Sequence, residues 1–173
     1  MGLPYETARK LEELYGCHEK EFGKVVQKLL ALTLVEMGFG LAEERAVQGV
    51  DIDVIAPGGE KLSFEVKTSQ SAQVTVQDKD IQGLESRLNA DGYRPLFAFI
   101  FRPHYLGDGW IIVPAGRVKK GTHNAMRLAS LDDGSLSREV NARFPELVER
   151  TFDDLMDCRR GTALNMLKGK YGI

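Results

Sequence analysis

Residues 49–67 read GVDIDVIAPGGEKLSFEVK, and this stretch decides the expected fold. Side chains in a β-strand alternate between its two faces. Both ends of the stretch alternate apolar with polar residues, and the apolar positions are Ile52, Val54, Leu62, Phe64 and Val66. A turn at Pro57, Gly58 and Gly59 separates the two ends. The stretch therefore predicts a two-stranded hairpin with one apolar and one polar face.

The apolar pattern also predicts how the two strands pair. Burying both apolar sets together sets Val54 opposite Phe64, which in turn sets Asp53 opposite Glu65. A slip of one residue would bury the carboxylates and expose the aromatic ring. Lys67 lies on the same face as Glu65, so the polar face is expected to gather two acids and one amine.

Carboxylates that face each other across a strand pair repel and destabilise the sheet. Lys67 offsets part of this repulsion, and a hard divalent cation such as Mg2+ (or Mn2+) suits the oxygen ligands. Such a metal bridges a phosphate and activates water. An acid-x-Lys triplet arises by chance about once or twice in a chain of this size. Glu65-Val66-Lys67 is the single such triplet here, so a solvated strand face is the competing interpretation.

The hairpin resembles the PD-(D/E)XK nuclease superfamily, in which an Asp precedes a strand that carries Glu-x-Lys. Archaeal Holliday-junction resolvases and Mrr-type restriction endonucleases are the nearest likenesses, over about residues 18–115. The matching segments are DVIA (53–56), FEVKT (64–68), DIQGL (80–84), GYRPLFAF (92–99) and GWIIV (109–113). The first motif reads Val-Asp or Ile-Asp where the family has Pro-Asp, so Asp51 competes with Asp53. Spacing and the following Val-Ile-Ala favour Asp53.

The resemblance implies an α/β fold, a restriction-endonuclease-like mixed β-sheet flanked by helices (αβββαβ core) with a C-terminal helical extension. Residues 1–116 would form the nuclease core with N-terminal helices, and residues 117–173 a helical extension packed on the same domain. Apolar periodicity predicts helices at 17–37, 76–90, 125–129, 136–143 and 145–167. Apolar runs predict strands at 40–47, at 110–113 and, buried on both faces, at 96–101.

The resemblance also assigns roles within the expected site. Asp53, Glu65 and the Val66 carbonyl would ligate the metal, with support from Glu19. Lys67 would position or polarise the attacking water and stabilise the transition state.

Two further polar residues have alternative interpretations. Glu19 lies at the edge of an apolar helix face, six and seven residues before Val25 and Val26, as in resolvase-like nucleases. The alternative is that Glu19 and Glu21 simply favour the positive N-terminus of the helix. Gln77 would help hold the scissile phosphate or water, or would only cap the next helix. Thr75 with Asp78 is the expected capping box of that helix.

Composition excludes several other classes. A chain of 173 residues that is 43% hydrophobic can bury one sizeable core. No apolar run reaches the length of a membrane span, and residues 1–10 lack a signal-peptide apolar region. A cytoplasmic protein is expected, with Cys17 and Cys158 reduced. A zinc enzyme is not indicated, because no Cys-x-x-Cys or His-Glu-x-x-His pattern is present.

The net charge of −2 is unusual for a nucleic-acid binder, but its distribution is uneven. Residues 117–173 contain 11 Lys and Arg against 8 Asp and Glu, whereas residues 1–116 contain 12 against 17. A basic cluster, which would touch phosphate or form a solvated surface, comprises Arg117, Lys119, Lys120, His123 and Arg127.

The leading hypothesis is a Mg2+-dependent endonuclease that hydrolyses phosphodiester bonds of branched or duplex DNA. Resolvase character would need paired nicks and therefore a homodimer. A catalytically silent nuclease-fold module for DNA binding or assembly is the alternative, and an RNA-directed nuclease is a third. The C-terminal helices would pack on the sheet, cover a dimer face or recognise substrate.

Overall fold

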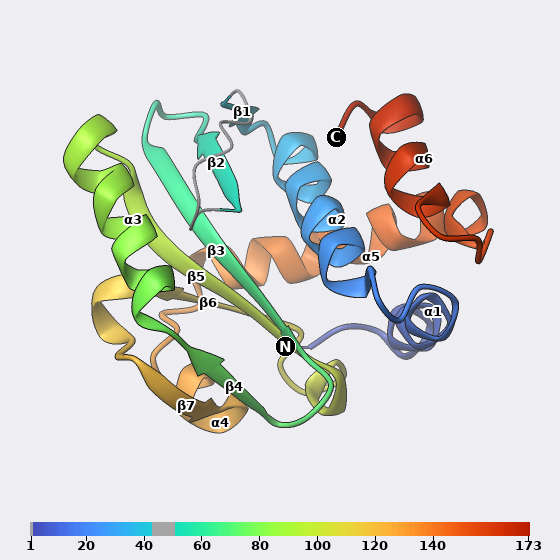
Figure 1. Cartoon of the computed structure of the whole chain (residues 1–173), viewed down its shortest axis with the longest axis horizontal. Helices are drawn as coiled ribbons and strands as arrows, with labels where there is room; N and C mark the ends of the chain where they lie inside the picture. Colours follow the sequence, from blue (N-terminus) through green and yellow to red (C-terminus); the bar gives the residue numbers. More distant parts are fainter. Residues whose placement is uncertain (1, 43–50) are drawn as a thin grey trace.

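The structure, a computed structural model, describes residues 2–42 and 51–173, and it contains a mixed five-stranded sheet (Figure 1). The strand order is β1-β2-β3-β5-β6. Strands β3 and β5 are parallel and the other neighbours antiparallel. The strands are β1 (Gly40–Leu41), β2 (Ile52–Ile55), β3 (Lys61–Ser69), β5 (Arg94–Phe101) and β6 (Trp110–Pro114). This arrangement, flanked by helices, confirms the predicted fold class.

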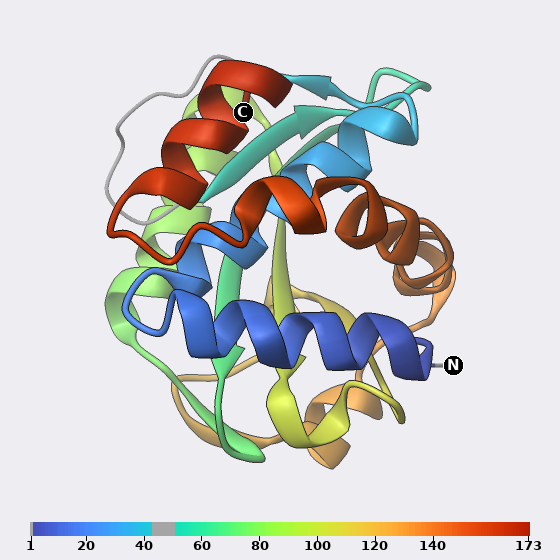
Figure 2. The ribbon, with the colours of Figure 1, turned by 90° about the vertical axis from the view of Figure 1, so that its right-hand side faces the viewer.

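Helices cover both faces of the sheet (Figures 1 and 2). One face carries α1 (Tyr5–Cys17), α2 (Phe22–Glu36), α5 (Ser135–Leu155) and α6 (Thr162–Tyr171). The other carries α3 (Asp78–Asp91) and α4 (Ala125–Ala129). Two short 3-10 helices, η1 (Arg102–His104) and η2 (Ala115–Arg117), follow β5 and β6.

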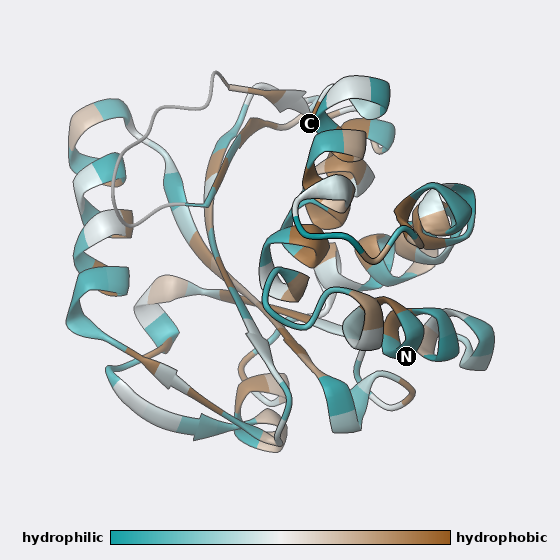
Figure 3. Ribbon diagram, turned by 45° about the vertical axis from the view of Figure 1, so that its right-hand side comes forward, coloured by the Kyte–Doolittle hydropathy of each residue, from teal (hydrophilic) through white to brown (hydrophobic). Residues whose placement is uncertain are grey.

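Strand β5 separates two apolar clusters. Leu96, Ala98 and Ile100 pack in the cluster that includes α2 and α5. The alternating Phe97, Phe99 and Phe101 pack in the second cluster, with residues of α3 and α4. The hydrophobic segments of the central strands and of α2 lie in this interior (Figure 3). The prediction of a strand buried on both faces is therefore confirmed.

The hairpin forms, but the predicted register is wrong by two residues. Val54 pairs with Leu62 and Asp53 pairs with Ser63. The cause is the turn, in which the Ala56 N–H donates to the Glu60 carbonyl at 2.7 Å and closes a three-residue loop. Gly59 permits this closure because its φ is 91°. A shift of two residues keeps every side chain on its predicted face.

A two-stranded ribbon, β4 (Gln73–Val76) with β7 (Gly121–Asn124), forms where the sequence predicts no strand. Strand β3 ends at Ser69, four residues before β4 begins. The third helix begins at Asp78 with Gln77 as N-cap, so the predicted Thr75 cap is wrong.

The bounds of the other helices differ in part from the prediction. The helix expected at 17–37 is α2, which begins at Phe22, and α1 precedes it. Helix α5 runs unbroken through Pro145, where two separate helices were predicted. Of the strand predicted at 40–47, Gly40–Leu41 forms β1, and residues 43–47 lie outside the described residues.

Cys17 and Cys158 form a disulfide, so the prediction of reduced cysteines is wrong. The bond joins the end of α1 to the segment between α5 and α6. No helix within residues 2–42 and 51–173 is both long and apolar enough to span a membrane.

Candidate active site

The polar face of the hairpin centres on Lys67, which projects from β3 toward the first turn of α3. Its Nζ lies 2.8 Å from Oδ2 of Asp80 and 3.3 Å from Oε1 of Glu65. The pKa of Lys67 is raised, since both carboxylates outweigh the opposing effect of burial. Lys67 is therefore held as an ammonium group between two acids.

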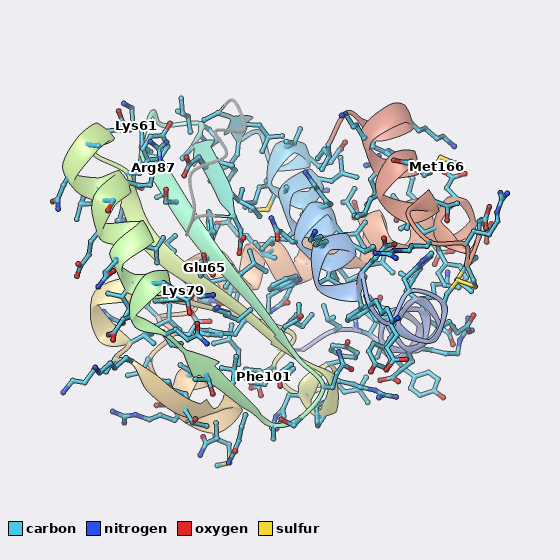
Figure 4. All side chains as sticks on the ribbon, in the orientation of Figure 1. Lys61, Glu65, Lys79, Arg87, Phe101 and Met166 are labelled. Carbon is cyan, nitrogen blue, oxygen red and sulfur yellow. A yellow bond between two sulfur atoms is a disulfide. The ribbon has the colours of Figure 1, made fainter. Side chains whose placement is uncertain are left out.

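Glu65 is a buried acid in the middle of β3, where Figure 4 labels it, and 7% of the residue is exposed. Burial and the nearby Asp51 carboxylate raise the pKa of Glu65 to about 8, although Lys67 opposes this. Within the described part of the chain, Oε2 of Glu65 is a buried oxygen without a hydrogen-bond partner. Such an atom is costly unless a ligand satisfies it.

Asp51 lies one residue before β2 and reaches the edge of β3. Its Oδ2 accepts a hydrogen bond from the Val66 N–H at 2.8 Å, and its own N–H donates to the Phe64 carbonyl at 3.0 Å. Gln27 of α2 donates to the Asp51 carbonyl at 3.2 Å. Burial raises the pKa of Asp51, against the opposing effects of the Val66 N–H and Lys67. These contacts fix the Asp51 carboxylate beside Glu65 and Lys67.

Asp53 does not face Glu65 as the predicted register required. It accepts a hydrogen bond from Ser63 and two from Arg87, whose Nε lies 2.9 Å away. Arg87 also pairs with Asp91 and stacks 4.4 Å above the Tyr93 ring. Figure 4 labels Arg87 near the end of α3 opposite to its first turn. The Asp53 carboxylate thus joins β2 to α3. It is Asp51, two residues earlier in the chain, that lies beside Glu65 and Lys67.

The other predicted site residues contribute no side chain to the contacts of Lys67. Glu19 is exposed in the turn between α1 and α2, where the Tyr15 hydroxyl donates to it at 3.4 Å. Glu21 accepts a hydrogen bond from the Gly161 N–H at 3.0 Å, which ties α2 to α6. Gln77 has an exposed side chain and donates its backbone N–H to Asp80 at 2.8 Å. Val66 contributes its N–H to the bond with Asp51.

Asp80 was not expected in the site. It is 2% exposed, and although burial would raise its pKa, hydrogen bonds from Lys67 and Gln77 lower it. The available signal is its spacing from Gln77, because an acid at the third position of a helix reaches back to the N-cap N–H. Helix α3, which begins after β4, holds this acid beside Lys67.

The donors fit a hard divalent cation by their chemistry. Asp51 and Glu65 are desolvated carboxylates with raised pKa values, and Glu65 has an unsatisfied oxygen. Oxygen ligands of this kind suit Mg2+. Still, no cluster of three or more His, Cys, Asp or Glu among the described residues is arranged to hold a metal ion. The charge of Lys67 partly takes the place of a cation in this arrangement.

Comparison with known proteins shows what the fold resembles. No protein-family model matches the sequence, and no curated protein matches it either. Among solved structures, Archaeoglobus fulgidus Hjc, a Holliday junction resolvase from an archaeal hyperthermophile, aligns with a TM-score of 0.53 at 16% identity. The alignment covers 67% of this chain and 95% of Hjc. The chain therefore shares the fold of this resolvase and adds about a third of its own length to it.

Proposed function

We propose that the protein is a metal-dependent endonuclease that hydrolyses phosphodiester bonds of branched or duplex DNA. The observation that carries the proposal is the cluster of Asp51, Glu65 and Lys67, in which a buried Glu65 oxygen has no partner. The shared fold with a Holliday junction resolvase supports it.

In this proposal Asp51 and Glu65 hold Mg2+ or Mn2+ together with the Val66 carbonyl. Asp51 replaces Asp53, whose carboxylate is bound by Arg87 and Ser63. When bound, the cation supplies charge stabilisation to the phosphodiester and makes water easier to deprotonate. A support role for Glu19 stays a prediction, which Glu19→Gln tests through metal affinity.

Lys67 acts on the substrate directly. Its ammonium donates hydrogen bonds to a phosphate oxygen or to the attacking water, and its charge stabilises the transition state as negative charge accumulates. Water would lose a proton to solvent as its oxygen bonds to phosphorus, one P–O ester bond would break, and the leaving alkoxide would take up a proton from solvent to become an alcohol. Asp80 keeps Lys67 charged and oriented, because the buried Asp80 carboxylate lies 2.8 Å from the partly buried Lys67 ammonium.

The test is incubation of the purified protein with Mg2+ or Mn2+ and a panel of substrates. The panel contains a four-way junction, linear duplex, flap, single-stranded DNA and RNA. Paired nicks at the junction indicate a resolvase and a homodimer, whereas cleavage of linear duplex alone indicates a restriction-like enzyme. Cleavage of RNA alone contradicts the assignment to DNA.

Lys67→Ala should lower cleavage by about 100-fold or more, as loss of a transition-state donor does. Glu65→Gln should do the same, because an amide cannot replace the carboxylate as a metal ligand. This second variant keeps the test valid if Lys67→Ala fails to fold. Lys168→Ala, which changes an exposed lysine of α6, is the matched control. Full activity of Lys67→Ala with intact folding would sink the assignment.

A catalytically silent DNA-binding or assembly module is the second candidate. The observation that favours it is the close pairing of Lys67 with Glu65 and Asp80, which places a positive charge beside both acids without a metal. A titration with Mn2+, followed by calorimetry on wild type and Glu65→Gln, separates the two. Heat of binding that the variant lacks supports the enzyme, and absence of binding in both supports the silent module.

A further inference from the structure

The ribbon of β4 and β7 has two faces of different character. Val74 and Val76 point toward the apolar cluster beneath α3 and α4. The alternate positions are exposed, and they are the uncharged polar residues Gln73, Thr75, Thr122 and Asn124. Thr75 and Thr122 are paired across the ribbon with their hydroxyl oxygens 3.1 Å apart. The ribbon therefore offers a row of hydrogen-bonding groups on an anchored support.

Charge around the ribbon differs from that of the rest of the chain. Residues 68–77, which lead into and include β4, contain no charged side chain. Residues 117–127, which flank and include β7, contain four Lys and Arg and no acid. The whole chain has a net charge of −2, so the remaining residues are clearly acidic. The fold pairs these two segments, which are far apart in sequence.

All four cations are exposed, and Lys119, Lys120 and Arg127 are the ones we consider for phosphate contact. Lys120 lies 3.4 Å from Asp78, but their side chains are 69% and 62% exposed, so this contact is weak. Arg117 differs, because it donates to the Leu131 carbonyl at 2.9 Å. The Lys119 carbonyl accepts a hydrogen bond from Nε2 of His123 at 2.6 Å, which fixes the backbone beside β7.

The ribbon adjoins the candidate active site in the chain and in space. Strand β4 links β3, which carries Glu65 and Lys67, to α3, which carries Asp80. Figure 1 shows the ribbon beside the start of α3 and far from α1 and α6. A polyanion lying across the ribbon would thus extend toward Lys67.

We infer that the β4–β7 ribbon is a docking arm for the phosphate backbone of duplex DNA. Lys119, Lys120 and Arg127 neutralise phosphates, and the exposed hydroxyl and amide groups donate hydrogen bonds to phosphate oxygens. These groups position the duplex without reading its sequence. The inference takes from the proposed function only that the ligand is DNA.

The test is a salt titration of binding to a fluorescent 30-base-pair duplex in EDTA, where no cleavage occurs. The ribbon variant carries Lys119→Gln, Lys120→Gln and Arg127→Gln. The control variant carries Lys20→Gln, Arg160→Gln and Lys168→Gln, which are exposed cations near α1 and α6. Both variants lose two lysines and one arginine, so their net charges are equal.

Each phosphate contact contributes about 0.9 to the slope of log K against log salt. We expect the ribbon variant to lose about two to three from that slope and the control to keep the wild-type value. Equal slopes for the two variants overturn the inference, as does a wild type that fails to bind the duplex at low salt. Salt-dependent binding through the ribbon without cleavage in Mg2+ would reject the proposed nuclease activity and retain the docking arm.

Discussion

Two aspartates separated by one residue have different environments. Asp51 is partly buried beside Glu65 and Lys67, whereas Asp53 accepts hydrogen bonds from Ser63 and the buried Arg87. Both point to the polar face of the hairpin, because strand positions two apart share a face. Their environments differ because α3 places Asp80 near Asp51 and Arg87 against Asp53.

Substituting each aspartate should therefore have opposite consequences. Asp51→Asn should abolish cleavage and leave stability nearly unchanged, since it removes a desolvated charge next to another acid. Asp53→Asn should cost about 2 kcal/mol of unfolding free energy, as loss of a hydrogen bond to a charged group does, and should retain the metal site. Urea unfolding and cleavage assays on both variants check this. Inactivity of a well-folded Asp53→Asn variant would restore Asp53 as the ligand.

Glu65 should make the stability of the metal-free protein depend on pH. Its pKa rises from 4.5 in the unfolded chain to about 8 in the folded protein. The folded state therefore binds the extra proton between these values, and its stability falls as pH rises through that window. The melting temperature should drop from pH 5 to pH 8 in wild type more than in Glu65→Gln. Added Mg2+ should raise it more at pH 8 than at pH 6, and a pH-independent metal effect would contradict the ligand role.

At the scale of elements, the polar face depends on α3. The buried residues of this helix include Asp80, Leu84 and Arg87, which share the stripe that faces the sheet. The stripe thus places the Asp80 carboxylate beside Lys67 and the Arg87 guanidinium beside Asp53. Charged residues normally predict an exposed position, so apolar periodicity gives no signal for a buried Asp80 and Arg87.

Alternation of apolar residues predicted the hairpin, its faces and the doubly buried β5. It could not fix the register, because a shift of two residues leaves both faces unchanged. The turn decides between the registers, and its closure at Ala56 and Glu60 depends on backbone geometry. The same limit applies to β4 and β7, whose pairing joins short polar segments without a strong apolar pattern.

The turn of the hairpin offers a direct test of this explanation. Gly59 has a φ of 91°, whereas the neighbouring Gly58 has no positive φ and no atom within 4 Å of an added Cβ. Gly59→Ala should cost about 1–2 kcal/mol, because a left-handed conformation is strained for residues with a Cβ. Gly58→Ala is the matched control and should be close to neutral. Equal effects of the two substitutions in thermal unfolding would show that the turn does not require Gly59.

At the scale of the whole molecule, helices from both ends of the chain pack together on one face of the sheet (Figure 2). Contacts between distant segments reinforce this layer, since Glu21 binds the Gly161 N–H and the buried His18 contacts the Leu155 carbonyl at 2.5 Å. Cys17 and Cys158 join the same regions covalently. Two cysteines without a local motif gave no signal for this pairing, because the helices that bring them together are distant in sequence.

The disulfide closes a sequence separation of 141 residues, so it restricts the unfolded chain strongly. Cys17→Ser with Cys158→Ser should lower the free energy of unfolding by about 2–5 kcal/mol, within the usual range for a native disulfide. Thermal unfolding with and without dithiothreitol measures the effect. The reductant should lower the melting temperature of wild type to that of the double variant and leave the variant unchanged. Cleavage at a temperature where both proteins are folded should be equal. The bond joins the end of α1 to the segment before α6, whereas Lys67 contacts Asp80 of α3, which lies on the other face of the sheet (Figure 1). A wild type whose melting temperature resists the reductant and equals that of the double variant would show that the bond does not stabilise the fold.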